Sequence, residues 1–137
     1  MLRKMLRSKI HHATITQCDL NYVGSITIDA DLLEASDIRP NEAVLVLDID
    51  NGARFETYVI KGKSGSGIIG INGAAARLVE VGHKVIIVCF GLLTEDKLDE
   101  HVSQIVVCDE QNRIADQFQY TSTLERPIEQ VSCAEWS

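Results

Sequence analysis

Two pairs of polar side chains have the types and spacing to bind an anion and to move a proton. Arg54 and Tyr58 are four residues apart on a predicted strand, so both point to one face of it. Lys9 and His11, two residues apart on another predicted strand, share a face for the same reason. We expect Arg54 to face inward, where a cation is costly to bury unless an anion meets it, so an internal salt bridge and a ligand site stay equally open. If the two strands adjoin, the four groups form one row.

The dipeptide Gly24-Ser25, between two extended stretches, is a second candidate centre. In an arbitrary chain such a pair is a turn, and here it would join two strands of a non-catalytic β-barrel binding module. Ser25 could instead be the nucleophile of a hydrolase, with His11 or His12 as its base. The sequence has no G-x-S-x-G pattern and no evident acid to orient the histidine, which disfavours the hydrolase.

Residues 62–73 hold five of the nine glycines and include a G-x-G-x-x-G match at 65–70. A dinucleotide site needs a helix that opens at these glycines, whereas Ile68-Ile69-Gly70-Ile71 is typical of a strand. Gly62-Lys63-Ser64 does not complete a P-loop either, because Thr57 stands where that motif requires a glycine. We therefore disfavour a nucleotide site in this segment.

The elements that must position these residues are mostly strands. We expect helices over 29–36, with Asp29 as N-cap, and from Gly73 to Gly82, together with a hairpin at Asn51-Gly52. The similar order of elements in 26–49 and 68–90 predicts a small closed β-barrel over residues 1–118, followed by a flexible tail over 119–137. The expected strands are 5–16, 26–28, 43–49, 54–61, 68–71, 84–90, 103–108 and one beginning at residue 113.

Composition narrows the class of protein. The chain has 137 residues, which suits one domain, and a formal net charge of −7, which disfavours nucleic acid as a partner. The longest apolar run, 85–93, is far shorter than the roughly 20 residues of a membrane helix, so we expect no membrane contact. The four cysteines form no C-x-x-C pair and have no histidine at metal-ligand spacing, so we predict no metal and a cytoplasmic location.

Five stretches of the sequence, in order over residues 1–116, form a further pattern: Lys9–His11, Tyr22–Asp29, Asn41-Glu42, Gly52–Tyr58 and Ile71–Ala76. In their residues and spacing, these stretches together resemble the bacterial pyruvoyl-dependent aspartate 1-decarboxylase family. The resemblance implies a mainly β fold, a small double-psi β-barrel with two short helices, and a homotetramer with sites between neighbouring subunits.

For function, the resemblance implies a proenzyme that cuts itself between Gly24 and Ser25, into pieces 1–24 and 25–137. Glycine lets the backbone strain so that the serine hydroxyl reaches its carbonyl. Ser25 would then become a pyruvoyl group, which forms a Schiff base with L-aspartate and takes up electrons as carbon dioxide leaves. The product would be β-alanine, a precursor of pantothenate and coenzyme A. Whether an accessory maturation protein assists the cleavage stays open.

The family's pattern also implies roles around the cleaved bond. Tyr58 would give a proton to the α-carbon of the substrate, and Thr57 would stabilise the oxyanion at Gly24 and later touch substrate. Arg54 and Lys9 would bind carboxylates, in an order that the sequence does not decide. The remaining members of the implied site are the backbone at a helix N-terminus, Gly73, Ala74 and Ala75, and the supporting residues Asn72, Tyr22 and His11.

Overall fold

The structure is a computed structural model that describes residues 1–125. Within this range the chain forms nine strands, one α-helix and two short 3-10 helices, so the predicted mainly β class is confirmed. The strands are β1 (Leu2–Thr14), β2 (Gln17–Asp19), β3 (Ser25–Asp29), β4 (Ala43–Asp48), β5 (Arg54–Gly62), β6 (Ile69–Asn72), β7 (Lys84–Thr94), β8 (Val102–Cys108) and β9 (Ile114–Thr121). The helices are α1 (Ala30–Ser36), η1 (Gly73–Arg77) and η2 (Glu95–Lys97).

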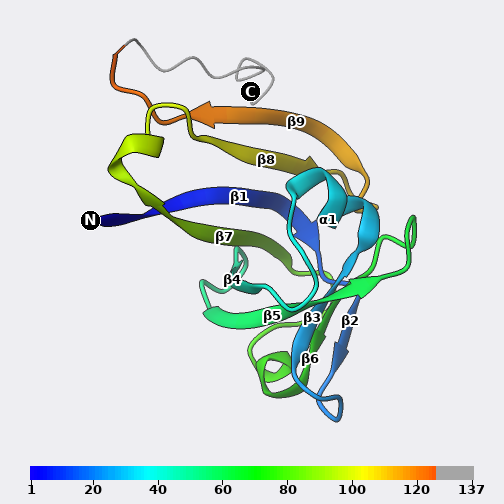
Figure 1. Cartoon of the computed structure of the whole chain (residues 1–137). Helices are drawn as coiled ribbons and strands as arrows, with labels where there is room; N and C mark the ends of the chain where they lie inside the picture. Colours follow the sequence, from blue (N-terminus) through cyan, green and yellow to red (C-terminus); the bar gives the residue numbers. More distant parts are fainter. Residues whose placement is uncertain (126–137) are drawn as a thin grey trace.

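All nine described strands belong to one curled sheet, in the order β2-β6-β3-β5-β4-β7-β1-β8-β9 (Figure 1). This order has two ends, so the predicted closure of the barrel is wrong as far as strand pairing goes. The reason is that the β8–β9 hairpin extends the sheet beyond β1. The residues that follow β1 nevertheless connect it to the segment before β7 and to β6: the Ile15 N–H donates to His83 O and the Thr16 N–H to Ile69 O, each at 2.9 Å. The sheet thus keeps the character of the small barrel that the resemblance implies.

A single apolar core lies inside the curl of this sheet. Alternate residues of the strands point inward, so β-branched side chains such as Ile26, Ile71 and Ile87 are fully buried. Parallel pairings, β1 with β8 and β3 with β5, join segments that are distant in the sequence. Burial on this scale holds β3 and β6 rigidly, which matters because both strands carry candidate site residues.

Local signals in the sequence placed several elements correctly. The Asp29 carboxylate accepts from Asp31 N–H at 2.8 Å and caps α1, as predicted. The hairpin at Asn51-Gly52 joins β4 to β5, with Gly52 at φ +76°. The second predicted helix is wrong in type and length, because η1 is a five-residue 3-10 turn that ends at Arg77. The three-residue strand β2 was not predicted.

The glycine-rich segment, residues 62–73, is held in place by Asp29. Both oxygens of the buried Asp29 carboxylate accept hydrogen bonds from the backbone of this segment, one from Gly65 N–H at 3.1 Å and one from Gly67 N–H at 2.7 Å. The strand β6 follows directly, so these glycines precede a strand and not a helix, as predicted.

The last described strand, β9, runs to Thr121, past the predicted domain end at 118. The rest of the predicted tail, 126–137, lies outside the described residues. Among residues 1–125, no helix has the length and apolar character needed to cross a membrane.

Candidate active site

The Gly24–Ser25 bond lies where the chain enters β3. Ser25 is the first residue of this strand and is 1% exposed, and its Cα partner on the antiparallel neighbour β6 is Asn72. The buried Asn72 amide donates from Nδ2 to Ser25 Oγ at 2.9 Å. The two residues were predicted to share a site, and the structure brings them into direct contact.

The backbone around Gly24 is tightly enclosed by Gly73. A Cβ placed on Gly73 would lie 2.7 Å from Gly24 Cα and 3.2 Å from Tyr22 O. The contact with Gly24 Cα would be shorter than real Cβ atoms make. Gly73 also has φ +77°, a conformation that favours glycine. The sequence Asn72-Gly73 therefore supplies both the donor to Ser25 and the space for the preceding residues.

Thr57 lies on β5 just before the part of this strand that pairs with β3. The parallel ladder between β3 and β5 begins with Ile26 opposite Val59, two residues after Gly24 on one side and two residues after Thr57 on the other. Thr57 is half-buried, whereas its neighbours at 56 and 58 are exposed, so its side chain points to the inner face of β5. This placement agrees with a role at the Gly24 carbonyl.

Lys9 and His11 do not lie next to Arg54 and Tyr58, so the predicted single row is wrong. The neighbours of β1 are β7 and β8, while those of β5 are β3 and β4. Two strands, β7 and β4, intervene, which separates the pairs by three strand spacings, roughly 14 Å. Adjacency of β1 and β5 depends on the order of strands in the sheet, which local patterns do not fix.

The two pairs do share the outer face of the sheet, because directly paired residues point to the same side. A shallow hollow of about 190 Å³ lies on this face. One row across the four strands consists of Lys9, Val88, Leu45 and Glu56, each the Cα partner of the next. The hollow is lined by Lys4, Ala43, Val44, Leu45, Glu56, Val88 and Phe90.

Arg54 is exposed in the single chain, so the expectation that it faces inward is wrong. It follows the alternation of β5, in which Phe55, Thr57 and Val59 occupy the inner face. Within residues 1–125, Arg54 forms no ion pair, which removes the internal salt bridge considered for it. Its guanidinium is therefore available to a ligand or to another chain.

Two side chains of β1, Lys9 and His11, have lowered pKa values. Burial lowers the pKa of Lys9, whose Nζ lies 5.7 Å from the centre of the Tyr120 ring. Burial, with the charges of His12 and Lys9, lowers the pKa of His11 to about 4. His11, whose ring stacks on His12 at 4.2 Å, is consequently neutral at neutral pH and can accept or donate a hydrogen bond.

Leu47 and Ile86 were not predicted as site residues, but the register places them between the cationic pairs. Leu47 is the Cα partner of both Arg54 and Ile86, so it forms an aliphatic surface beside Arg54. The hairpin signal at Asn51-Gly52 did not contain this pairing, because a two-residue loop there would place Ile49 opposite Arg54, whereas the longer loop of the structure pairs Leu47 with Arg54. No local signal pointed to Ile86.

The other predicted members lie around η1. Tyr22 and Ala74 are exposed and Ala75 is half-buried. Ala74 and Ala75 follow Gly73 in η1, and the Tyr22 carbonyl oxygen lies 3.2 Å from the place that a Cβ of Gly73 would take. Since η1 is a single 3-10 turn, these residues offer a few backbone N–H groups rather than the end of a regular helix.

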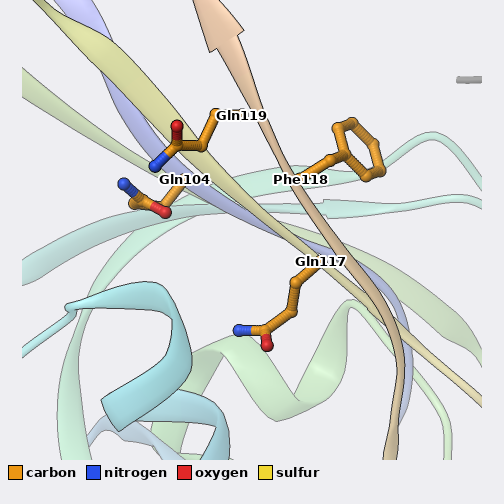
Figure 2. Close-up of a pocket in the computed structure, with 4 residues that line it drawn as sticks. All are labelled: Gln104, Gln117, Phe118 and Gln119. Carbon is orange, nitrogen blue, oxygen red and sulfur yellow. The ribbon is translucent and has the colours of Figure 1, made fainter. Parts of the chain in front are cut away.

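Two other features of the described chain fall outside this group. A hollow of about 330 Å³ on β8 and β9 has no charged lining and contains none of the predicted residues (Figure 2). Asp48, Asp50 and His83 lie close enough for a metal, but Asp48 already accepts from Asp50 N–H and contacts His83 Nδ1. The lining of the hollow is Gln104, Gln117, Phe118 and Gln119.

Comparisons with known proteins identify a family that covers most of the chain. The family model described as aspartate decarboxylase matches residues 1–115. A protein named aspartate 1-decarboxylase from Bacillus cereus (strain G9842) is 55% identical over 114 residues, which cover 83% of this chain and 90% of that protein. One of the same name from Bacillus thuringiensis (strain Al Hakam) is 54% identical over the same share of each chain.

Proposed function

The chain belongs to the aspartate decarboxylase family, a family of lyases, and we propose that it decarboxylates L-aspartate with a pyruvoyl group made from its own Ser25. The products are carbon dioxide and β-alanine, which feeds pantothenate and coenzyme A synthesis. The observation that carries the proposal is the buried Ser25 hydroxyl, held by Asn72 beside a Gly24 that Gly73 encloses. The cytoplasmic location and a maturation partner stay predictions.

The first reaction would be on the chain itself. Ser25 Oγ adds to the Gly24 carbonyl carbon, the C–N bond breaks, and the hydroxyl proton passes to the Ser25 nitrogen, which leaves an ester. Loss of the Ser25 α-proton then breaks the Cβ–Oγ bond and releases the Gly24 carboxylate. Water replaces nitrogen at the remaining unsaturated residue, with loss of ammonia, and gives the pyruvoyl ketone.

Residues of this chain have the chemistry to assist each stage. Asn72 donates to Ser25 Oγ and so fixes where the oxygen lies relative to the bond it attacks. Thr57, two residues before the start of the ladder with β3, would donate to the Gly24 carbonyl oxygen as it gains negative charge. A glycine at 73 leaves room for Gly24 before cleavage.

The surroundings of Ser25 also fit the small ketone that cleavage would leave. The Asn72 amide, which donates at the position of Ser25 Oγ, can donate to a carbonyl oxygen as well. When present, this ketone supplies an electron sink for decarboxylation. Gly73, Ala74 and Ala75 would contact the substrate through backbone N–H groups, with Tyr22 and His11 as supporting residues.

Substrate binding would require two copies of the chain. Ser25, Asn72 and Thr57 form one group, whereas Arg54 and Lys9 lie on the outer face of the sheet and are not brought to Ser25. We propose a homotetramer in which the outer face of one copy meets the Ser25 group of its neighbour. Arg54 and Lys9 would hold the two carboxylates of aspartate and Tyr58 would return a proton to the α-carbon.

Intact-mass measurement of purified protein tests the proposal. The wild-type chain should yield pieces of 24 and 113 residues (137 − 24 = 113), with the larger one lacking ammonia relative to a serine-started chain. The Ser25→Ala variant should stay whole and inactive. An active, uncut Ser25→Ala protein would refute the scheme.

A further inference from the structure

We infer that Thr27 is a positioning residue for cleavage at Gly24–Ser25 and that it acts through the amide of Asn72. This inference rests on the proposed self-cleavage. Asn72 Nδ2 lies 2.9 Å from Ser25 Oγ and 3.1 Å from Thr27 Oγ1, both hydrogen-bond distances. An amide nitrogen carries two hydrogens, so it donates one to each hydroxyl.

The second hydrogen bond fixes the plane of the amide. The terminal torsion of asparagine is broad, so an amide held at one point rotates with little resistance. Ser25 and Thr27 are alternate residues of β3 and point to the same side, which places both oxygens within reach of one amide. With both bonds made, the N–H aimed at Ser25 Oγ has a defined direction.

The position of the Thr27 hydroxyl is set by two glycines on the neighbouring strands. A Cβ on Gly62 would lie 3.2 Å from Thr27 Cγ2, and one on Gly70 would lie 3.6 Å from Thr27 Cβ. The absence of side chains at both positions makes room for Thr27, and its methyl group packs toward Gly62. Thr27 therefore fits between β5 and β6 with its hydroxyl within reach of the Asn72 amide.

Cleavage is sensitive to this arrangement because Ser25 Oγ must approach a carbonyl carbon of the adjacent residue. A misplacement of a fraction of an ångström in a nucleophile lowers the fraction of time spent in reactive geometry. Ser25 Oγ accepts from Asn72, which leaves its own proton free to move to the departing nitrogen. Thr27 therefore assists the first step without touching a reacting atom.

The test is the rate of cleavage of the full chain made by cell-free synthesis and sampled over time by intact mass. Thr27→Val, which keeps the shape and loses the hydroxyl, should slow cleavage about three- to tenfold, the effect of one hydrogen bond. Thr27→Ser should restore the rate to within about twofold of wild type. The matched control is Thr16→Val, since the Thr16 hydroxyl bonds only the backbone of Ile69; its rate should equal that of wild type.

A double-mutant cycle separates positioning through Asn72 from a general structural role. In an Asn72→Ala background, Thr27→Val should slow cleavage no further, because the amide that it orients is gone. A further slowdown in that background, equal slowing by Thr27→Val and Thr27→Ser, or a wild-type rate in Thr27→Val would each overturn the inference while the proposed function stands. A wild-type chain that stays whole would overturn both.

Discussion

At the scale of single residues, the candidate site separates polar groups that hold the chain from polar groups that would meet the substrate. Asn72 is buried and its amide is committed to two hydroxyls of β3. Arg54 and Tyr58 are exposed, and within residues 1–125 neither has an ion pair or hydrogen bond through its side chain. A buried donor serves a fixed geometry, whereas an exposed cation and phenol are available to a ligand that arrives later.

The Tyr58→Phe substitution separates the two reactions. The variant should cleave at the wild-type rate, because the phenol does not touch the Gly24–Ser25 bond, but its turnover of L-aspartate should fall at least about a hundredfold with the loss of the proton donor. Intact mass and a β-alanine assay measure the two properties. The matched control is Tyr120→Phe, which keeps its ring beside Lys9 and should retain turnover. Normal turnover in Tyr58→Phe would exclude Tyr58 as the donor.

A methyl group at position 73 should prevent the close approach to Gly24. In Gly73→Ala the new Cβ would lie 2.7 Å from Gly24 Cα, so the chain must move and cleavage should slow more than about tenfold. Gly52→Ala is the control, because Gly52 has nearly the same φ, +76°, but nothing within 4 Å of its Cβ position. It should lose about 1 kcal/mol of stability and cleave normally. Equal cleavage rates in the two variants would contradict this account.

At the scale of elements, local chemistry could be predicted and long-range pairing could not. Asp29 before α1 and Asn51-Gly52 between β4 and β5 carry their signals within a few residues. The place of β1 three strands from β5 depends on contacts between distant segments, so the predicted row of Lys9 and Arg54 failed. The alternation of β5 was read correctly in period, but its buried face was assigned wrongly, although Phe55 and Val59 alternate with the charged Arg54 and Glu56 and so indicate that Arg54 faces outward.

The same limit explains which parts of the candidate site were found. Ser25, Asn72 and Gly73 were named from a resemblance between short stretches, because no physical signal links positions 47 residues apart. The role of Thr27 was not predicted, since it follows from the pairing of β3 with β6. The pairing register of distant strands is therefore what could not be predicted from the sequence.

The end of the β4–β5 hairpin carries a pH-dependent contact. The hydrogen bond that His83 Nδ1 donates to Asp48 Oδ2, at 2.7 Å, raises the pKa of His83 above its usual value near 6.5. A raised pKa in the folded state contributes stability below the unfolded value and loses it as pH rises through the folded value. His83→Asn should therefore lower the free energy of unfolding more at about pH 5.5 than at about pH 8.5, measured by urea denaturation.

Glu80→Gln is the control for this contact. The Glu80 carboxylate lies 3.7 Å from His83 Nε2, a weaker interaction than the hydrogen bond that His83 donates to Asp48, so this variant should keep most of the pH dependence. To measure the contact without other titrating groups, each variant is compared with wild type at the same pH. A pH-independent effect of His83→Asn would contradict the assigned contact.

At the scale of the whole molecule, an acidic protein must still attract a dianion. The net charge of −7 is spread over the chain, whereas Lys9 and Arg54 share one face of the sheet. Local cations decide the field at a site more than the total charge does. If this face meets the Ser25 group of a neighbour, the substrate would lie between copies.

Mixing two inactive variants tests a site shared between copies. Ser25→Ala removes the pyruvoyl precursor and Arg54→Ala removes a carboxylate ligand, so each alone should be inactive. Co-expressed in equal amounts, they should recover about a quarter of wild-type activity, because random assembly pairs an intact Ser25 group with an intact outer face in about one site of four. Light scattering should give the mass of a tetramer. No recovery in a confirmed mixed assembly would place both groups in one chain.

The position of β1 between β7 and β8 has a consequence for the life of the protein (Figure 1). The proposed cut after residue 24 would separate β1 and β2 from the rest of the chain, while both strands would stay hydrogen-bonded to their neighbours in the sheet. Folding would then have to precede cleavage, and a molecule denatured afterwards would become two separate peptides. Its recovery would depend on their encounter, and thus on concentration, whereas the uncut precursor needs only itself.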